Sequence, residues 1–210
     1  IEAIGREVDP AWMGRQVYVG GALCYADYNA AWGGQSAELF TDVSRVVPLE
    51  GMAPELGVLL ALAATALHGV ERAAIGPDRR VLVLGQGPVG QLAARFAKGD
   101  GAWVAVCDRS ASRLTRSVGD VITEVEEAGL GEALRDALPE PVDVIVEATG
   151  SMAALTEALP FLAAGGMVAL LGYYARLDLP YMPLFLKEAQ LVTAKEWAPG
   201  DLIRCRDRIV

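Results

Sequence analysis

One hexapeptide, Gly85-Gln86-Gly87-Pro88-Val89-Gly90, has residue types and a spacing that suit contact with phosphate groups. It directly follows the apolar run Val81–Leu84 and opens the segment Val89–Lys98, whose apolar residues have helical spacing. The first glycine permits a tight turn, the second lets the backbone approach a pyrophosphate, and the third lets the helix press against the strand. The helix N-terminus attracts negative charge. Glycine-rich turns also serve ordinary packing, but this context predicts a dinucleotide site.

An acidic residue at the next strand end sharpens the prediction. Asp108 ends the apolar run Trp103–Cys107 and follows Gly85 by 23 residues. At this spacing a carboxylate accepts hydrogen bonds from both ribose hydroxyls, which favours NAD. The same charge repels the 2′-phosphate of NADP, although Arg109 beside it can accommodate one. We therefore predict NAD as the cofactor, with NADP as the alternative.

Two further strand ends carry candidate cofactor contacts. Glu147-Ala148-Thr149-Gly150 follows one apolar run, and Gly172-Tyr173-Tyr174 follows the next. Ligands of open α/β sheets bind outside the carboxyl ends of the strands. We expect Ala148, Thr149, Gly172 and Tyr173 to lie at the cofactor.

The elements that must position these residues alternate between strand and helix from Arg79 onward. Short apolar strands that alternate with helices of about ten residues indicate a parallel sheet covered on both faces, the doubly wound α/β class. The predicted strands are Val81–Leu84, Trp103–Cys107, Val121–Thr123, Val142–Glu147, Met167–Leu171 and Gln190–Lys195, and the predicted helices are Val89–Lys98, Ser110–Ser117, Leu130–Leu138 and Met152–Leu162.

Residues 1–56 have a different pattern, with the short apolar runs Val17–Val19, Ala37–Phe40 and Val46–Val47 between glycine pairs. Such punctuation predicts part of a β-rich module. Pro54–Val70 is rich in Leu and Ala and predicts one or two buried helices. We expect the dinucleotide-binding domain to cover 57–196, with its entry helix, and 197–210 to return toward the first module. The start at Ile1 and the close in an unfinished helix suggest a fragment.

Composition narrows the classes of partner. The net charge of −9 is spread along the chain, so no basic stripe exists to bind nucleic acid. Cys24, Cys107 and Cys205 form neither a disulfide framework nor a metal clip, which favours a reducing, cytoplasmic location. The most apolar stretch, Gly57–Ala66, is too short to span a bilayer, so we expect a soluble protein without an integral membrane segment.

The order of parts resembles the medium-chain dehydrogenase/reductase superfamily, through VLVLGQGPVGQ, VDVIVEATG and LAAGGMVALLGYY. This resemblance implies a GroES-like catalytic module before the Rossmann domain, cofactor contacts from Thr65 and Arg113, and a homodimer whose sheet continues across the strand Gln190–Lys195. Zinc-dependent members place a ligand cysteine four residues before the threonine, where this chain has Ala61. No cysteine cluster remains for a structural zinc. We therefore predict no metal.

Three segments resemble more narrowly the bacteriochlorophyllide a dehydrogenases: VGGALCYADYNAAWGGQSAEL, LLALAATALHG and GYYARLDLPYMPLFLKEAQLVTAKEWAPGDL. This resemblance implies oxidation of the 3-(1-hydroxyethyl) group of a chlorophyllide-type tetrapyrrole. A large flat substrate calls for aromatic and apolar walls. The candidates in these segments are Tyr25, Tyr28, Trp32, Tyr173, Tyr174, Tyr181, Phe185 and Trp197.

Alcohol oxidation without zinc needs another acceptor for the hydroxyl proton. His68 shares a helix face with Thr65, and Tyr25 lies in the loop that replaces the zinc lobe, so both are catalytic candidates, although a lone helical histidine more often serves packing. Two other functions stay open: a zinc-free quinone or enone reductase that uses NADPH, and a non-catalytic nucleotide-binding protein.

Overall fold

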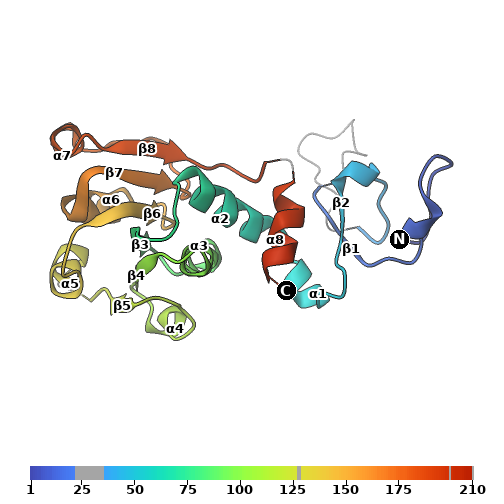
Figure 1. Cartoon of the computed structure of the whole chain (residues 1–210), viewed down its shortest axis with the longest axis horizontal. Helices are drawn as coiled ribbons and strands as arrows, with labels where there is room; N and C mark the ends of the chain where they lie inside the picture. Colours follow the sequence, from blue (N-terminus) through green and yellow to red (C-terminus); the bar gives the residue numbers. More distant parts are fainter. Residues whose placement is uncertain (22–35, 127–128, 199, 210) are drawn as a thin grey trace. The chain divides into compact units, whose positions relative to one another are not determined.

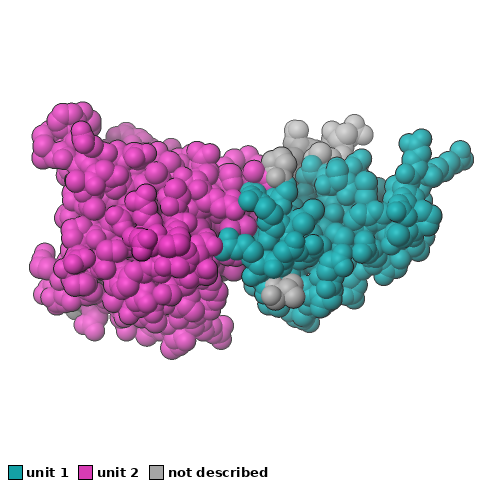
Figure 2. All heavy atoms as spheres, in the orientation of Figure 1, with its two compact units in different colours: residues 1–61, 199–210 teal, residues 62–198 magenta. Residues whose placement is uncertain are grey.

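The computed structural model describes residues 1–21, 36–126, 129–198 and 200–209. The chain folds into two compact units, one formed by residues 1–61 and 199–210 and the other by residues 62–198, which Figure 2 colours separately. The larger unit holds all three predicted strand-end motifs.

The larger unit is built on a six-stranded sheet with the order β5-β4-β3-β6-β7-β8, in which every neighbouring pair is parallel (Figure 1). This order is that of a doubly wound dinucleotide-binding sheet, so the predicted α/β class is confirmed. The strands are β3 (Arg80–Leu84), β4 (Trp103–Asp108), β5 (Val121–Glu124), β6 (Val142–Glu147), β7 (Leu162–Leu170) and β8 (Gln190–Thr193).

Helices cover both faces of this sheet. Leu82 and Leu84 of β3 pack in one apolar cluster with Leu134 and Leu155 from the helices of one face. The alternate residue Val83 is equally buried and points to the other face, which α2 and α3 cover (Figure 1). The helices are α2 (Leu60–Arg72), α3 (Pro88–Gly99), α4 (Ala111–Leu114), α5 (Leu130–Ala137), α6 (Met152–Ala158), the 3-10 turn η3 (Leu159–Phe161) and α7 (Tyr181–Leu186).

The strand order reverses between β3 and β6. After β3 the chain crosses to β4 and β5 on one side, and after β6 it crosses to β7 and β8 on the other. The connections therefore diverge and leave a crevice at the carboxyl ends of β3 and β6, where such sheets bind ligands. The glycine loop and the segment after Glu147 both begin at this point.

The smaller unit contains one antiparallel pair, in which Val17 lies opposite Pro48. The last helix joins this pair, because the Arg206 guanidinium donates a 3.0 Å hydrogen bond to the Pro48 carbonyl. Its elements are η1 (Pro10–Trp12), β1 (Val17–Val19), η2 (Val43–Arg45), β2 (Val46–Pro48), α1 (Pro54–Gly57) and α8 (Asp201–Ile209).

Three predictions of local structure were wrong. Ala37–Phe40 forms a loop, and its Phe40 ring is 79% exposed, because Glu38 interrupts the short apolar run. The helix expected over Ser110–Ser117 ends at Leu114. Helix α7, which has no polar face in the sequence, was not predicted.

Candidate dinucleotide-binding site

The glycines of the hexapeptide 85–90, which forms the loop after β3 and the first turn of α3, meet different steric demands. Gly85 has φ +88°, and a Cβ atom there would lie 2.7 Å from Thr149. A Cβ atom on Gly90 would lie 1.9 Å from the Gly85 carbonyl oxygen. At Gly87 φ is −68° and a Cβ atom would meet no described atom within 4 Å. Packing within the described chain therefore explains Gly85 and Gly90 but not Gly87.

Gly87 is the N-cap residue of α3 and supplies no side-chain cap to the helix. The first N–H groups of a helix lack partners within the helix and suit an anion. Pro88, Val89 and Gly90 form the first turn of α3. The arrangement offers phosphate oxygens a positive helix end that has no side-chain cap among the described residues.

A cavity of about 410 Å³ opens beside this loop, at the carboxyl ends of β3, β4 and β6. Its walls are formed by the glycine loop, by Asp108 and the two arginines that follow it, by the segment after β5, and by the start of α6. The structure thus brings together seven of the predicted cofactor residues: Gly85, Gly87, Asp108, Arg109, Arg113, Ala148 and Thr149.

Asp108 closes one wall of the cavity, and only 8% of its side chain is exposed. The N–H of Gln86 donates a 2.6 Å hydrogen bond to its Oδ2, and the N–H of Ser110 a 2.8 Å bond to its Oδ1. The Arg113 guanidinium lies 3.6 Å from Oδ2. A carboxylate has four acceptor positions, so Asp108 is oriented by the loop and still able to accept hydroxyl donors.

Glu147 ends β6 and is fully buried. The backbone N–H groups of Thr149 and Gly150 donate to its Oε1 at 2.6 and 3.1 Å, and the Thr149 hydroxyl donates to the same oxygen. A Cβ atom on Gly172 would lie 2.2 Å from its Oε2, so β7 can end over this carboxylate only with glycine. The carboxylate thereby holds in place the segment that follows β6 and the segment that follows β7.

Gly172 and Tyr173 lie at the carboxyl end of β7, outside the lining of the 410 Å³ cavity. The Tyr173 side chain is 90% exposed, whereas the hydroxyl oxygen of Tyr174 is buried. Burial raises the pKa of the Tyr174 phenol above its usual value, and the nearby Glu147 carboxylate raises it further. The neighbouring tyrosines therefore differ, since one presents a free ring and the other a protonated buried phenol.

Helix α2 brings Thr65 and His68 to this end of the sheet. A Cβ atom on Gly69 would lie 2.8 Å from a methyl group of Leu171, the residue before Gly172. The helix backbone next to His68 therefore packs directly against the end of β7. Thr65 and His68 are both partly exposed. Tyr25, the other catalytic candidate, lies outside the described residues.

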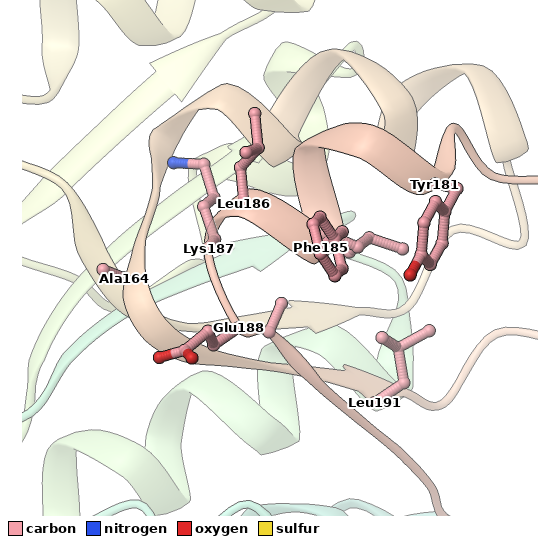
Figure 3. Close-up of a pocket in the computed structure, with 9 residues that line it drawn as sticks. Ala164, Tyr181, Phe185, Leu186, Lys187, Glu188 and Leu191 are labelled. Carbon is pink, nitrogen blue, oxygen red and sulfur yellow. The ribbon is translucent and has the colours of Figure 1, made fainter.

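A larger cavity, of about 680 Å³, lies at the opposite end of the sheet (Figure 3). It is formed by α7 and the start of β8, and Ala164 places it at the amino-terminal half of β7. Tyr181 and Phe185 stack here, with ring centroids 5.3 Å apart. The expectation that the aromatic residues share one substrate wall is thus wrong for these two, because the crossover returns them to the amino ends of the strands.

The fold and the glycine-loop site together define a dinucleotide-binding α/β protein. Residues 88–198 match the family model described as zinc-binding dehydrogenase, and the chain belongs to this family, within the medium-chain dehydrogenase/reductase superfamily. No helix in the described parts is long and apolar enough to cross a bilayer.

Among curated relatives, L-galactonate-5-dehydrogenase of Escherichia coli K12 is 32% identical over 82% of this chain and 52% of its own length. 2-Desacetyl-2-hydroxyethyl bacteriochlorophyllide A dehydrogenase of Rhodobacter capsulatus is 33% identical over 92% and 59%. A solved alcohol dehydrogenase of E. coli CFT073 in complex with NADH superposes with a TM-score of 0.77 at 19% identity, over 99% of this chain and 68% of its own. The chain thus spans little more than half the length of these curated relatives.

The family description implies zinc, so we compare the metal-ligand side chains of this chain with the ligands that a zinc site requires. Within the described ranges, no three His, Cys, Asp or Glu side chains are grouped so that they could hold a metal ion. Ala61 offers only a methyl group. The described donors do not fit a zinc site, which requires about four N, S or O ligands, and we derive no step through one.

Proposed function

We propose that this chain binds NAD and takes part in the oxidation of a secondary alcohol. The observation that carries the proposal is Gly87, a glycine that no described neighbour requires and that caps a helix N-terminus beside Asp108. A bound nicotinamide cofactor would supply the acceptor for the hydride that leaves the carbinol carbon. The glycine loop would hold the pyrophosphate, and Asp108 the adenosine ribose.

The preference for NAD over NADP rests on the surroundings of Asp108. Its carboxylate lies inside the cavity and would oppose a 2′-phosphate, although Arg109 and Arg113 line the same wall. Only one of the two arginines is paired with the acid, at 3.6 Å. A single ion pair leaves the carboxylate able to recognise ribose hydroxyls.

For the hydroxyl proton we assign His68 as the acceptor, in place of a metal. The contact of α2 with Leu171 supports this role, because it brings the helix to the strand end where the nicotinamide half of a dinucleotide would lie. General bases typically contribute factors of about 10²–10⁴ to the rate. We expect His68→Gln to lose turnover by at least about 100-fold while the Kd for NAD changes less than about threefold; an unchanged turnover would remove His68 from the mechanism.

As substrate we propose the 3-(1-hydroxyethyl) group of a chlorophyllide-type tetrapyrrole. The 33% identity to the bacteriochlorophyllide enzyme over 92% of this chain supports it, and the 90% exposed ring of Tyr173 offers a flat apolar contact. The similar identity to the L-galactonate enzyme favours a second candidate, a small polyol acid.

One assay separates these candidates. The full-length protein is incubated with NAD or NADP and either 3-(1-hydroxyethyl) bacteriochlorophyllide a or L-galactonate, and NADH formation and the red absorption band of the pigment are followed. We expect the pigment band to move with NAD. Turnover of L-galactonate alone would replace the substrate. A parallel incubation contains NADPH and a small quinone, and reduction of the quinone there would replace the reaction. If none of these incubations shows turnover while calorimetry shows tight NAD binding, the protein is non-catalytic.

We further propose a cytoplasmic homodimer that joins through β8. This strand is the last of the sheet and pairs only with β7 within the described chain. Leu191 on β8 and Phe185 and Leu186 on α7 expose large apolar side chains next to this free edge. A second copy across a twofold axis would pair the two edges and cover these side chains.

A further inference from the structure

The fully buried carboxylate of Glu147 lies at the centre of the ligand-binding end of the sheet. Its residue pairs in register with Leu84, directly before the glycine loop, and with Leu170 near the end of β7. The Thr149 segment that it holds also contacts Gly85, since a Cβ atom there would lie 2.7 Å from Thr149. Glu147 is therefore connected to the glycine loop and to the end of β7.

Every hydrogen-bond donor to this carboxylate from the described residues is neutral. The two backbone N–H groups and the Thr149 hydroxyl carry no net charge. Across the described ranges, no Lys, Arg or His side chain forms an ion pair with Glu147. Tyr174 adds no charge, because burial and the adjacent carboxylate raise the pKa of its phenol. A carboxylate that is hydrogen-bonded but unneutralised keeps an electric field that extends beyond its contacts.

The position of Glu147 in the sheet determines which half of a bound dinucleotide lies within this electric field. In a doubly wound sheet the pyrophosphate sits at the switch point and the two nucleotide halves extend to either side. Asp108 assigns the adenosine half to the β4 side, so the nicotinamide half belongs to the side of β6 and β7. The oxidised nicotinamide ring carries one positive charge, and the reduced ring carries none.

We propose that Glu147 sets the relative affinity of the site for the two redox states of the cofactor, favouring the positively charged oxidised ring over the neutral reduced ring. The inference rests on the proposed function, because it requires that a nicotinamide dinucleotide binds. A buried negative charge on this side strengthens the binding of the oxidised cofactor and gives no such gain to the neutral reduced one, which suits alcohol oxidation.

The test compares dissociation constants measured by titration calorimetry on the full-length protein. The ligands are NAD, NADH and benzamide adenine dinucleotide, in which carbon replaces the charged pyridinium nitrogen and the ring stays flat. A unit charge within roughly 10 Å of the ring changes an affinity by about tenfold at a partly buried site. We expect the wild type to bind NAD about tenfold more tightly than NADH and the benzamide analogue, and Glu147→Gln to bind all three about equally.

Thr149→Val is the matched neutral control, because it removes one donor to the same carboxylate without changing the charge. We expect it to weaken NAD and the benzamide analogue by the same factor. If Glu147→Gln does not fold, Glu147→Asp, which keeps the charge, must retain the preference for NAD, and loss of the preference in it overturns the inference.

The outcomes distinguish this inference from the proposed function. A wild type that binds none of the three ligands refutes the proposed function and the inference with it. A wild type that binds NAD and the benzamide analogue equally, or a folded Glu147→Gln variant that keeps the preference for NAD, refutes only the inference.

Discussion

Gly87 and Gly90 belong to one glycine-rich hexapeptide, but of the two only Gly90 is required by packing within the described chain. Ala at position 90 would place a methyl group 1.9 Å from the Gly85 carbonyl oxygen, so the helix has to move away from the strand end. Ala at position 87 fits a φ of −68° and open space. The function of Gly87 can therefore be tested without disturbing the fold.

We expect Gly87→Ala to leave the free energy of unfolding within about 0.5 kcal/mol of the wild type and to raise the Kd for NAD at least about tenfold, because its methyl group occupies the approach of the pyrophosphate. Gly90→Ala is the matched control and should cost about 1–3 kcal/mol of stability through overpacking. Urea unfolding and titration calorimetry measure both quantities. Unchanged NAD affinity in Gly87→Ala would show that the loop does not bind the pyrophosphate.

At Asp108 the prediction concerns the choice of cofactor. Asp108→Asn removes the negative charge that opposes a 2′-phosphate and keeps the size of the side chain, while Arg109 and Arg113 remain on the cavity wall. We expect the ratio of the Kd for NADP to the Kd for NAD to fall about tenfold. Arg109→Gln in the same assay should weaken NADP alone. A ratio that stays constant in Asp108→Asn would exclude the carboxylate as the determinant of specificity.

At the scale of elements, burial decided which predictions were correct. The strands β3 and β4 at the centre of the sheet were predictable because a strand covered on both faces reads as a continuous apolar run, and Val81–Leu84 and Trp103–Cys107 show this pattern. Helix α7 was missed because its residues Tyr181–Leu186 are apolar on all sides, and several of them stay exposed in the described chain. Periodicity carries no signal for such a helix.

The buried elements also determine the reactivity of two cysteines. Burial raises the pKa of the Cys107 thiol in β4 to about 12, and burial likewise raises that of Cys205 in α8 to about 12. Compared with a thiol of pKa 9.0, such a group has roughly a thousandfold less thiolate at pH 8. We expect a short treatment with iodoacetamide at pH 8 to leave both unlabelled in the native protein and to label both in 6 M guanidinium chloride, as peptide mass spectrometry would show. Rapid native labelling of Cys107 would mean that β4 opens.

At the scale of the whole molecule, only part of the candidate site could be predicted from the sequence. Gly85, Gly87 and Asp108 follow from local spacing, because a turn, a helix start and a strand end are local features. The role of Glu147 and the contact between Gly69 and Leu171 depend on segments that are distant in the sequence and meet only after folding. A Glu-x-Thr-Gly string directly after an apolar strand was the one local signal that could have indicated Glu147.

The two edges of the sheet allow a controlled test of the proposed homodimer. Leu191 on β8 and Ile122 on β5 are both exposed apolar residues on edge strands, at 38% and 48%. We expect Leu191→Glu to convert a particle of twice the chain mass into a monomer, because two like charges would meet across the twofold axis beside a desolvated apolar patch. Ile122→Glu should leave the mass unchanged. Size-exclusion chromatography with light scattering measures both, and dissociation caused by Ile122→Glu but not by Leu191→Glu would move the interface to β5.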